Sequence, residues 1–407
     1  MIVFPQGFLW GAATSAHQVE GENRNNDWWK WERSANLKET SGSACRHYQL
    51  FKEDFDLARS LNHNCHRFSI EWSRIFPSSG AISREELTHY RNVIQALKER
   101  GLEPIVSLHH FTNPLWFSKL GGWENPGSQG HYLNYVRRVV EEFADLVKYW
   151  VTINEPMVYV YYSYVIGAWP PQEKSFLKAR RVTANLISAH TQAYKLIQVI
   201  YRNKGLPKPE VGIAKNMQAF VPCKNNFRNR LAVYLRDKSF NFDFLNKLAK
   251  SKTMDFIGVN YYTRSLVETS SWSLNNVLTR ICQDNHSSLL KNSLGWDIYP
   301  EGLVDLLLRL KIYDLPVIIL ENGICTMDDA LRWNFINQHL KSIGIALAKG
   351  VRISGYIYWS LLDNFEWDKG FGPRFGLIGV DYSDFRRTVR ESARIFSLVC
   401  KTGILEQ

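Results

Sequence analysis

The chain has 407 residues, of which 45% are hydrophobic and 22% are charged, and this balance excludes an intrinsically disordered protein. No apolar stretch is long enough to span a bilayer, and the N-terminal residues 1–5 lack the basic and apolar segments of a secretion signal. We therefore expect a globular, cytoplasmic protein without a membrane partner.

The 6 cysteines are scattered between Cys45 and Cys400, and none forms a Cys-x-x-Cys pair. This spacing does not match the ligand pattern of a zinc site. We expect reduced, mostly buried thiols, as is usual in the cytoplasm, and neither a metal ion nor an organic cofactor.

The net charge of +11 is concentrated in one segment: residues 201–252 contain twelve lysines and arginines but three acids. A basic patch can bind nucleic acid or another anionic surface. The segment contains no nucleic-acid motif, so we interpret it as solvated helix faces and loops. We expect no specific nucleic-acid partner, only weak, salt-sensitive contacts with polyanions.

Short apolar runs alternate with longer segments of helical periodicity along the chain. The eight predicted strands are, in chain order, Phe8–Ala13, Cys65–Ile70, Pro104–His109, Lys148–Ile153, Val211–Ala214, Asp255–Val259, Pro316–Leu320 and Gly355–Trp359. The predicted helices are Tyr48–Leu61, Arg84–Arg100, His131–Leu146, Ala179–Tyr201, Glu301–Leu310, Met327–Lys349 and Thr388–Val399. No linker or internal repeat divides the sequence.

This alternation predicts an α/β protein, a (β/α)8 TIM barrel formed as a single domain by residues 1–407. An open, doubly wound sheet is the alternative. A barrel carries its catalytic groups at the carboxyl ends of its strands, and polar or aromatic side chains follow seven of the eight predicted strands. The exception is Val211–Ala214, which is followed by Lys215-Asn216.

Two carboxylates follow strands that lie far apart in the sequence. Glu155 stands in Thr152-Ile153-Asn154-Glu155-Pro156, and Glu321 stands in Leu320-Glu321-Asn322-Gly323. A single glutamate after a strand is usually a surface ion-pair residue. Two glutamates delivered to the same end of a barrel indicate instead a paired-carboxylate enzyme that cleaves glycosidic bonds.

Six motifs together resemble those of glycoside hydrolase family 1, the β-glucosidase/β-galactosidase family. In family order they are Phe8–Gly21, Arg67–Ile75, Thr152–Pro156, Asp255–Thr263, Leu320–Gly323 and Trp359–Trp367. The matches run from Phe8 to Asp381, so the resemblance covers nearly the whole chain. Any one of these motifs is weak, but the ordered set is very specific.

The resemblance implies a retaining exo-β-glycosidase in which Glu155 is the general acid/base and Glu321 is the nucleophile. Carboxyl groups of a retaining pair stand roughly 5–5.5 Å apart, which allows covalent capture of the sugar. The resemblance also assigns Arg67, Tyr262 and Asn260 to support of the nucleophile. It assigns substrate binding to Gln18, His110, Asn154, Trp296, Trp359, Glu366, Trp367 and Phe375. For Asn260 and Phe375, structural support and ligand contact are equally good interpretations.

The implied substrates are β-D-glucosides, galactosides and fucosides, including oligosaccharides, with transglycosylation as a side activity. Two alternatives remain open. One is a 6-phospho-β-glycosidase, although Glu366 would repel a 6-phosphate. The other is a non-catalytic barrel that binds an anionic partner through residues 201–252. We expect His109 and His110 not to share a metal ion, because neighbouring strand residues point to opposite faces.

The chain departs from the family pattern in length. It is short for the family, and the missing residues fall between Ala214 and Asp255, around the fifth and sixth strands, and before Trp296. Phe111 and Thr112 also stand where the family often has Trp and Asp. A shortened region could open the leaving-group side, remove a helix or weaken the barrel wall.

Overall fold

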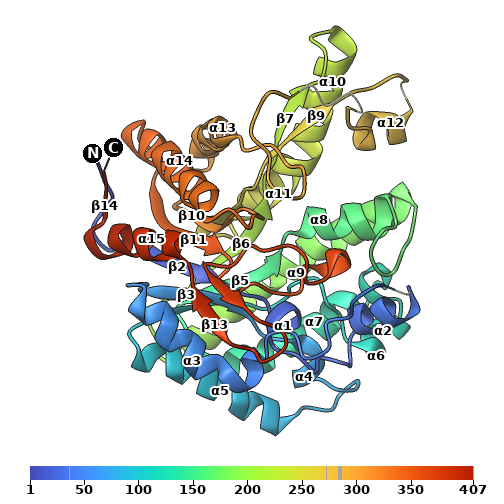
Figure 1. The fold of residues 1–407 in the computed structure, drawn as a ribbon. Helices are drawn as coiled ribbons and strands as arrows, with labels where there is room; N and C mark the ends of the chain where they lie inside the picture. Colours follow the sequence, from blue (N-terminus) through green and yellow to red (C-terminus); the bar gives the residue numbers. More distant parts are fainter. Residues whose placement is uncertain (36, 272, 283–286, 407) are drawn as a thin grey trace.

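The computed structural model describes residues 1–35, 37–271, 273–282 and 287–406. In this part of the chain, eight parallel strands close a barrel in the order β10-β11-β2-β3-β4-β5-β6-β8 (Figure 1). They are β2 (Leu9–Ala13), β3 (Cys65–Ser69), β4 (Glu103–Ser107), β5 (Tyr149–Asn154), β6 (Glu210–Asn216), β8 (Phe256–Asn260), β10 (Val317–Asn322) and β11 (Ile353–Trp359). Each overlaps one predicted strand. The predicted TIM barrel is confirmed, and the open-sheet alternative is wrong.

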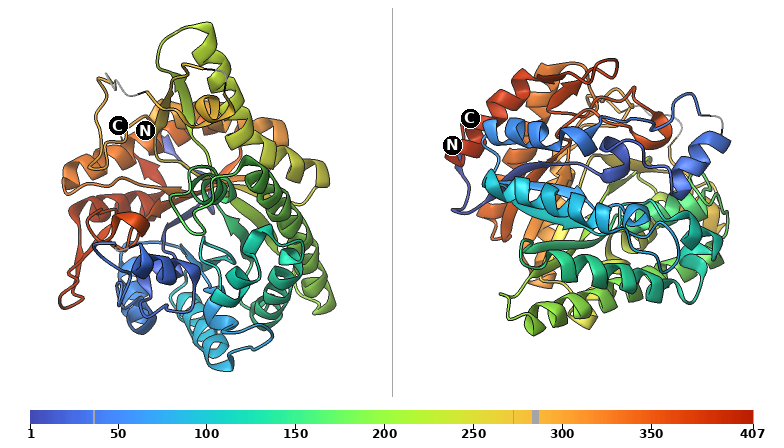
Figure 2. Two further views of the ribbon diagram at one scale, coloured as in Figure 1. Left: turned by 90° about the vertical axis from the view of Figure 1, so that its right-hand side faces the viewer. Right: turned by 90° about the horizontal axis from the view of Figure 1, so that it is seen from below.

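Long helices surround the barrel (Figure 2). They are α3 (His47–Ser60), α5 (Arg84–Glu99), α7 (Ser128–Phe143), α9 (Phe176–Asn203), α13 (Pro300–Leu310), α14 (Asp329–Ala348) and α15 (Glu391–Thr402), and each overlaps a predicted helix. In α5, Val93, Ile94 and Leu97 are buried on one face, and the Ser83 side chain caps the first turn by accepting from the Glu86 amide. No helix among the described residues is both long and apolar enough to cross a bilayer.

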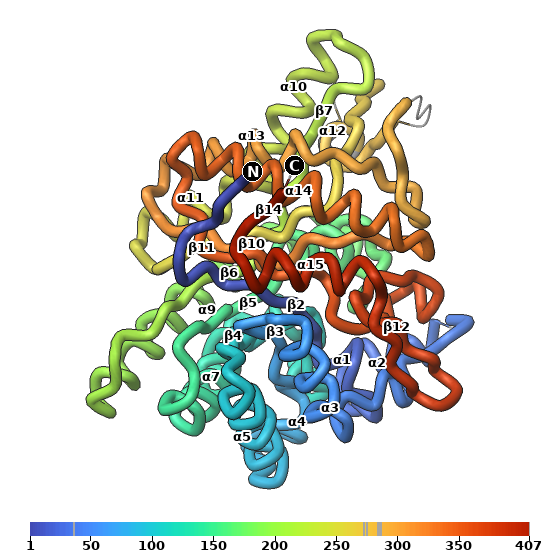
Figure 3. Tube along the Cα trace, turned by 60° about the vertical axis from the view of Figure 1, so that its left-hand side comes forward, coloured from blue at the N-terminus to red at the C-terminus, as the bar shows by residue number. Residues whose placement is uncertain are grey.

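Shorter elements fill the connections between the long helices and the strands. The helical ones are α1 (Ala16–Val19), α2 (Asp27–Ser34), α4 (Trp72–Ile75), α6 (Leu115–Lys119), η1 (Gly122–Glu124), α8 (Pro156–Val160), η2 (Tyr161–Val165), η4 (Lys311–Tyr313) and η5 (Trp367–Lys369). Strands β12 (Ile378–Val380) and β13 (Arg387–Val389) form a hairpin. Strands β1 (Ile2–Val3) and β14 (Ile404–Leu405) pair antiparallel, so the two termini lie side by side (Figure 3).

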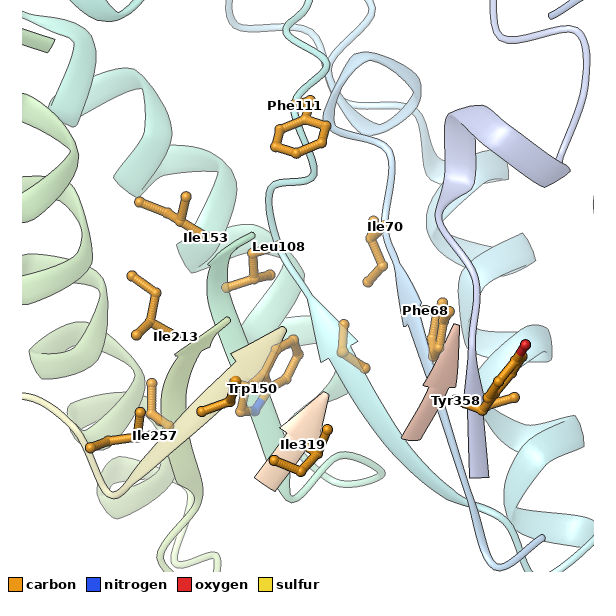
Figure 4. Packing of buried hydrophobic residues seen from close by; sticks show 14 of the residues in the cluster. Phe68, Ile70, Leu108, Phe111, Trp150, Ile153, Ile213, Ile257, Ile319 and Tyr358 are labelled. Carbon is orange, nitrogen blue, oxygen red and sulfur yellow. The ribbon is translucent and has the colours of Figure 1, made fainter. Parts of the chain in front are cut away.

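The core has two layers, because side chains alternate between the two faces of each barrel strand. An inner cluster takes residues from every barrel strand and so fills the barrel interior; Ala13, Val151, Ala214 and Ile318 belong to it. An outer cluster lies between the strands and the helices and includes Phe68, Trp150, Ile213, Ile257 and Ile319 (Figure 4).

Between β6 and β8 the chain forms β7 (Ala219–Pro222), α10 (Phe227–Arg236), η3 (Asp237–Phe242) and α11 (Asp243–Ser251). Strand β7 pairs with β9 (Arg264–Val267), and α12 (Leu274–Thr279) contacts α10. We call β7, α10, η3, β9 and α12 the cap; its outer part projects from the barrel (Figure 1). Strands β6 and β8 remain paired from Gly212–Phe256 to Asn216–Asn260. The barrel wall is therefore closed between β6 and β8, although the shortened sequence between Ala214 and Asp255 could have weakened it.

The cap contains a disulfide between Cys223 and Cys282, which are 59 residues apart. The expectation that all the cysteines are reduced is therefore wrong. Strand β9 brings the two together, because the Cys223 amide donates to the Val267 carbonyl and the Cys282 amide donates to the Leu266 carbonyl. Local cysteine spacing cannot reveal such a pairing. The other cysteines, Cys45, Cys65, Cys325 and Cys400, are free and buried.

Candidate active site

Glu155 and Glu321 line one cavity of about 870 Å³ at the carboxyl ends of the barrel strands. Glu155 follows β5 directly and has a left-handed backbone, with φ 44° and ψ 56°. Its amide donates to the Ala214 carbonyl on β6 at 2.8 Å. A non-glycine residue rarely adopts this conformation, and such residues concentrate at functional sites. Glu321 lies within β10, and in the barrel order β6 and β8 separate β10 from β5.

Both carboxylate oxygens of Glu321 are held by donors. Arg67 Nη1 donates to Oε1 at 2.5 Å, and the Tyr262 hydroxyl donates to Oε2 at 2.6 Å. Burial, together with the charge of Glu321, raises the pKa of Tyr262 well above its usual range, so this phenol stays protonated as a donor. Gly323 lets the chain turn close to β11, where a Cβ would collide with the Trp359 carbonyl oxygen. Glu321 is therefore charge-paired and fixed in orientation.

Glu155 is in a different environment. Burial, and secondarily the charge of Glu321, raises the pKa of Glu155 to about 7. Its Oε1 accepts from the side-chain Nδ2 of Asn260 at 2.8 Å and from that of Asn216 at 3.0 Å. One carboxylate of the pair is thus matched by a cation, while the other is held by neutral donors and keeps a proton up to neutral pH.

The side chain of Asn260 contacts Glu155 rather than Glu321. Its side-chain nitrogen donates to Glu155 Oε1 and, at 3.2 Å, to Asn154 Oδ1. The reason is its position in the barrel: the backbone of Asn260 is in register with Glu321 on one side and with Asn216 on the other. The side chain turns toward the β5–β6 side. The support of the nucleophile that the resemblance implies for Asn260 stays a prediction.

A second group of polar residues lies next to the glutamates. Asn154 Oδ1 accepts from Arg67 Nη2 at 2.6 Å, and Asn154 Nδ2 lies 3.1 Å from His110 Nε2. Burial, then the charge of Arg67, keeps the pKa of His110 well below its usual range, so the ring is neutral and its Nε2 can accept. Gln18 Nε2 donates to Glu366 Oε2 at 3.3 Å.

Glu366 is another carboxyl group of the cavity, and Asp297 and Asp368 also line it. Burial, followed by the charge of Glu321, raises the pKa of Glu366 to about 8. Glu155, Glu321 and Glu366 lie close together in this cavity, and Arg67 pairs with Glu321. Protonation of Glu366 therefore limits the repulsion between the three carboxyl groups. A ligand that brings hydroxyl donors to Glu366 would favour its ionised form.

Aromatic side chains form the rest of the inner cavity. Trp359 and Trp367 are buried, and each ring lies 6.0 Å from that of His110. Trp296 is 38% exposed and lies toward solvent, 6.1 Å from the Tyr262 ring and 6.3 Å from the Phe375 ring. Flat apolar faces next to polar side chains suit a ligand with a C–H face and a hydroxyl edge.

The structure brings the predicted site residues together in two sets. Those that line the cavity are Gln18, His110, Glu155, Tyr262, Trp296, Glu321, Trp359, Glu366, Trp367 and Phe375. The others, Arg67, Asn154 and Asn260, contact members of this lining by hydrogen bonds.

Sequence reasoning missed Asn216, Trp169 and Tyr162. All three line the cavity, and Asn216 also contacts Glu155. The signal for Asn216 was present, because Asn216 is a polar residue just after the predicted fifth strand, the one strand without an assigned site residue. Trp169 and Tyr162, whose rings stack at 4.5 Å, lie beyond β5 in a region without a strand-end signal.

His109 and His110 have separate partners. His109 Nε2 lies 3.0 Å from Asn113 Oδ1, whereas His110 Nε2 faces Asn154. Across residues 1–35, 37–271, 273–282 and 287–406 there is no group of three or more His, Cys, Asp or Glu side chains placed to hold a metal ion.

A TIM barrel that places two buried glutamates in one cavity at its strand ends, one of them paired with an arginine, has the arrangement of a glycoside-cleaving enzyme. Comparison with known proteins assigns the family. The model of "Glycosyl hydrolase family 1" matches residues 1–250 and 243–404. The chain therefore belongs to glycosyl hydrolase family 1.

Relatives from several organisms resemble the chain over its whole length. Beta-glucosidase A of Thermotoga maritima is 32% identical over 99% of both chains. The beta-galactosidase of Pyrococcus woesei is 31% identical over 100% of this chain and 98% of its own. The structure of a beta-glycosidase from Pyrococcus horikoshii has a TM-score of 0.93 and 41% identity, over 100% of this chain and 96% of that one.

Proposed function

We propose that this protein is a retaining, exo-acting β-glycosidase of the β-glucosidase type that also accepts β-galactosides and β-fucosides. Glu321 is the nucleophile and Glu155 the acid/base. The observation that carries this proposal is the contrast between the two glutamates in one cavity: Glu321 is held by a cation and a phenol, and Glu155 has a pKa near 7.

The reaction runs as a double displacement. In the first step a Glu321 oxygen bonds to the anomeric carbon, the glycosidic bond breaks, and Glu155 gives its proton to the leaving oxygen. Esterification removes the charge of Glu321, so the pKa of Glu155 falls. In the second step Glu155 takes a proton from water, the water oxygen bonds to the anomeric carbon, and the ester breaks. A sugar hydroxyl in place of water gives transglycosylation.

The neighbouring residues suit recognition of a neutral terminal hexose. Glu366 and Gln18 form one hydrogen-bonding edge, and Asn154 with His110 forms another. Trp359 supplies an apolar face. Structures of the Thermotoga maritima beta-glucosidase with glucoimidazole and with deoxynojirimycin support a glucose-like ligand for relatives that share this fold.

Glu366→Gln will reduce kcat/KM for nitrophenyl β-glucoside by roughly 10- to 150-fold, because hydrogen bonds from hydroxyls to a charged acceptor stabilise by about 1.5–3 kcal/mol each. Steady-state kinetics will measure the loss. The exposed Glu22→Gln is the control and should leave kcat/KM unchanged. Equal rates for Glu366→Gln and the unmodified enzyme would remove Glu366 from substrate binding.

The part of the cavity beyond the glutamates supports an apolar leaving group. Its walls come from η2, α9 and the cap, and its apolar members include Val165, Ile166, Phe220, Phe240 and Leu266. An alkyl or aryl group fits these apolar walls.

For n-alkyl β-glucosides, kcat/KM will rise by roughly two- to fourfold per added methylene over the first several carbons, since burial of each CH2 contributes about 0.8 kcal/mol. Ile166→Ser will flatten this dependence. Leu177→Ser, on the surface of α9 outside the cavity lining, is the matched control. A rate that is independent of alkyl length in the unmodified enzyme would contradict an apolar leaving-group site.

A panel of nitrophenyl glycosides tests the proposal as a whole. We expect turnover of β-glucoside, β-galactoside and β-fucoside, none of the α-anomers, and a much lower rate with 6-phospho-β-glucoside. A preference for the phosphorylated sugar would favour the phospho-glycosidase alternative instead.

The non-catalytic alternative depends on the basic segment as a binding surface, and several of its cations are already used. Lys215 and Arg236 are buried, and Lys208 and Lys238 are paired with Asp255 and Asp243. Heparin binding without glycosidase turnover, at both low and high salt, would favour that alternative over ours.

A further inference from the structure

Lys215 is a buried lysine beside the acid/base that the proposed reaction does not use. On β6, Ala214 belongs to the inner cluster and Ile213 to the outer one, so Lys215, two residues after Ile213, lies on the outward face of the strand. Its side chain has 0% exposure. Buried lysines are rare because removing an ammonium from water is costly.

The Lys215 ammonium has few partners in this position. Nζ donates to the Asn216 carbonyl at 2.5 Å and lies 4.5 Å from the centre of the Phe240 ring in η3. Among the described residues, no carboxylate lies within ion-pair distance of it. The acids of η3 and α11 form ion pairs with other residues: Asp237 pairs with Arg309, and Asp243 pairs with Lys238.

The same asparagine connects this lysine to Glu155. The Asn216 carbonyl accepts from Lys215, while the Asn216 side chain donates to Glu155 Oε1. The charge of Glu155 acts on Lys215 and opposes the lowering of its pKa by burial. A cation behind the strand and a carboxyl group in front of it are therefore linked through one residue at the end of β6.

We propose that Lys215 is a positioning residue for the acid/base: it fixes the end of β6 so that the Asn216 amide faces Glu155, and its positive charge favours the ionised form that Glu155 needs in the second step. This inference rests on the proposed role of Glu155. It adds a charge from outside the cavity to the residues that tune this carboxyl group.

The sign of the effect follows from the groups around Glu155. Glu321 disfavours the ionised form and Arg67 favours it, while the Asn260 and Asn216 amides also favour it. Glu366 and Tyr262 share the cavity. Burial lowers the pKa of Lys215 to about 7, with Glu155 acting against that decrease, so Lys215 carries its charge below neutral pH and loses it above. Because a nearby positive charge favours the ionised carboxylate, we expect loss of Lys215 to raise the pKa of Glu155.

The test uses Lys215→Met and the pH dependence of kcat/KM for nitrophenyl β-glucoside. We expect the alkaline limb to move up by about one pH unit, as for loss of a nearby opposite charge. The good leaving group of dinitrophenyl β-glucoside makes the second step rate-limiting. We therefore expect kcat for this substrate to fall more than kcat for an alkyl glucoside. Lys238→Met, an exposed lysine of η3, is the control and should leave both unchanged.

Lys215→Arg gives a second, independent test. Arginine keeps its charge above neutral pH, so the alkaline limb should move to lower pH, opposite to the shift for Lys215→Met. An unchanged limb in a folded variant, with reduced thermal stability alone, would make Lys215 purely structural and overturn the inference. If Glu155→Gln itself keeps the alkaline limb, it is the proposed role of Glu155 that fails.

Discussion

Glu321→Gly will lower kcat for nitrophenyl β-glucoside by about 10⁴-fold or more, because removal of a nucleophile closes the covalent route. The fold should survive, since glycine at the end of β10 leaves the inner barrel cluster intact. The loss would be in kcat rather than in KM, because the contacts of Gln18 and Glu366 with the sugar remain. Steady-state assays measure kcat and KM, and thermal melting measures whether the fold survives.

Azide should restore part of this activity. The missing carboxylate leaves space between Arg67 and Tyr262, and azide is a small anion that the Arg67 cation attracts. Azide then attacks the anomeric carbon in a single displacement, and Glu155 still protonates the leaving group. The product is the α-glycosyl azide. Glu321→Gln keeps the space filled and should not be rescued. Full turnover by Glu321→Gly without azide would contradict its role.

Glu155→Gln will have an effect that depends on the leaving group. Loss of general acid catalysis should lower kcat/KM by about 10²- to 10⁴-fold for alkyl glucosides, which need protonation, and far less for dinitrophenyl β-glucoside. Parallel kinetics with the two substrates give the ratio directly. The same loss for both substrates would show that Glu155 does not donate the proton.

The pH profile gives an independent reading of the same residue. The first step needs protonated Glu155, and the pKa of Glu155 is raised to about 7. In the unmodified enzyme kcat/KM should therefore fall as pH rises through about 7. In Glu155→Gln this alkaline limb should disappear, because glutamine does not titrate. A limb that persists near the same pH in the variant would have to come from another group.

Much of the fold follows from local patterns in the sequence. The strand at Val317–Asn322 is a β-branched run, and α5 has apolar residues at helical spacing, so both were predictable without tertiary information. The two glutamates were predictable for the same reason, because each follows such a run and parallel strands of a barrel present the same end.

The partners of individual side chains were not predictable in this way. Asn260 lies between two strands in register, and the sequence does not say whether its amide turns to Glu155 or to Glu321. The Cys223–Cys282 disulfide depends on the pairing of β7 with β9, two short strands with weak periodicity. The sequence also does not show that Lys215 is buried against Phe240 of η3, and its proposed role depends on that burial.

Trapping of the covalent intermediate tests the central claim most directly. A 2-fluoro-2-deoxy-β-glucoside with a good leaving group slows the second step, so the glycosyl-enzyme should accumulate and be found by peptide mass spectrometry on Glu321. Inactivation should be one-to-one, and Glu321→Gln should not be labelled. A label on any other residue, or turnover to the α-anomer as first product, would contradict a nucleophilic Glu321 facing Glu155.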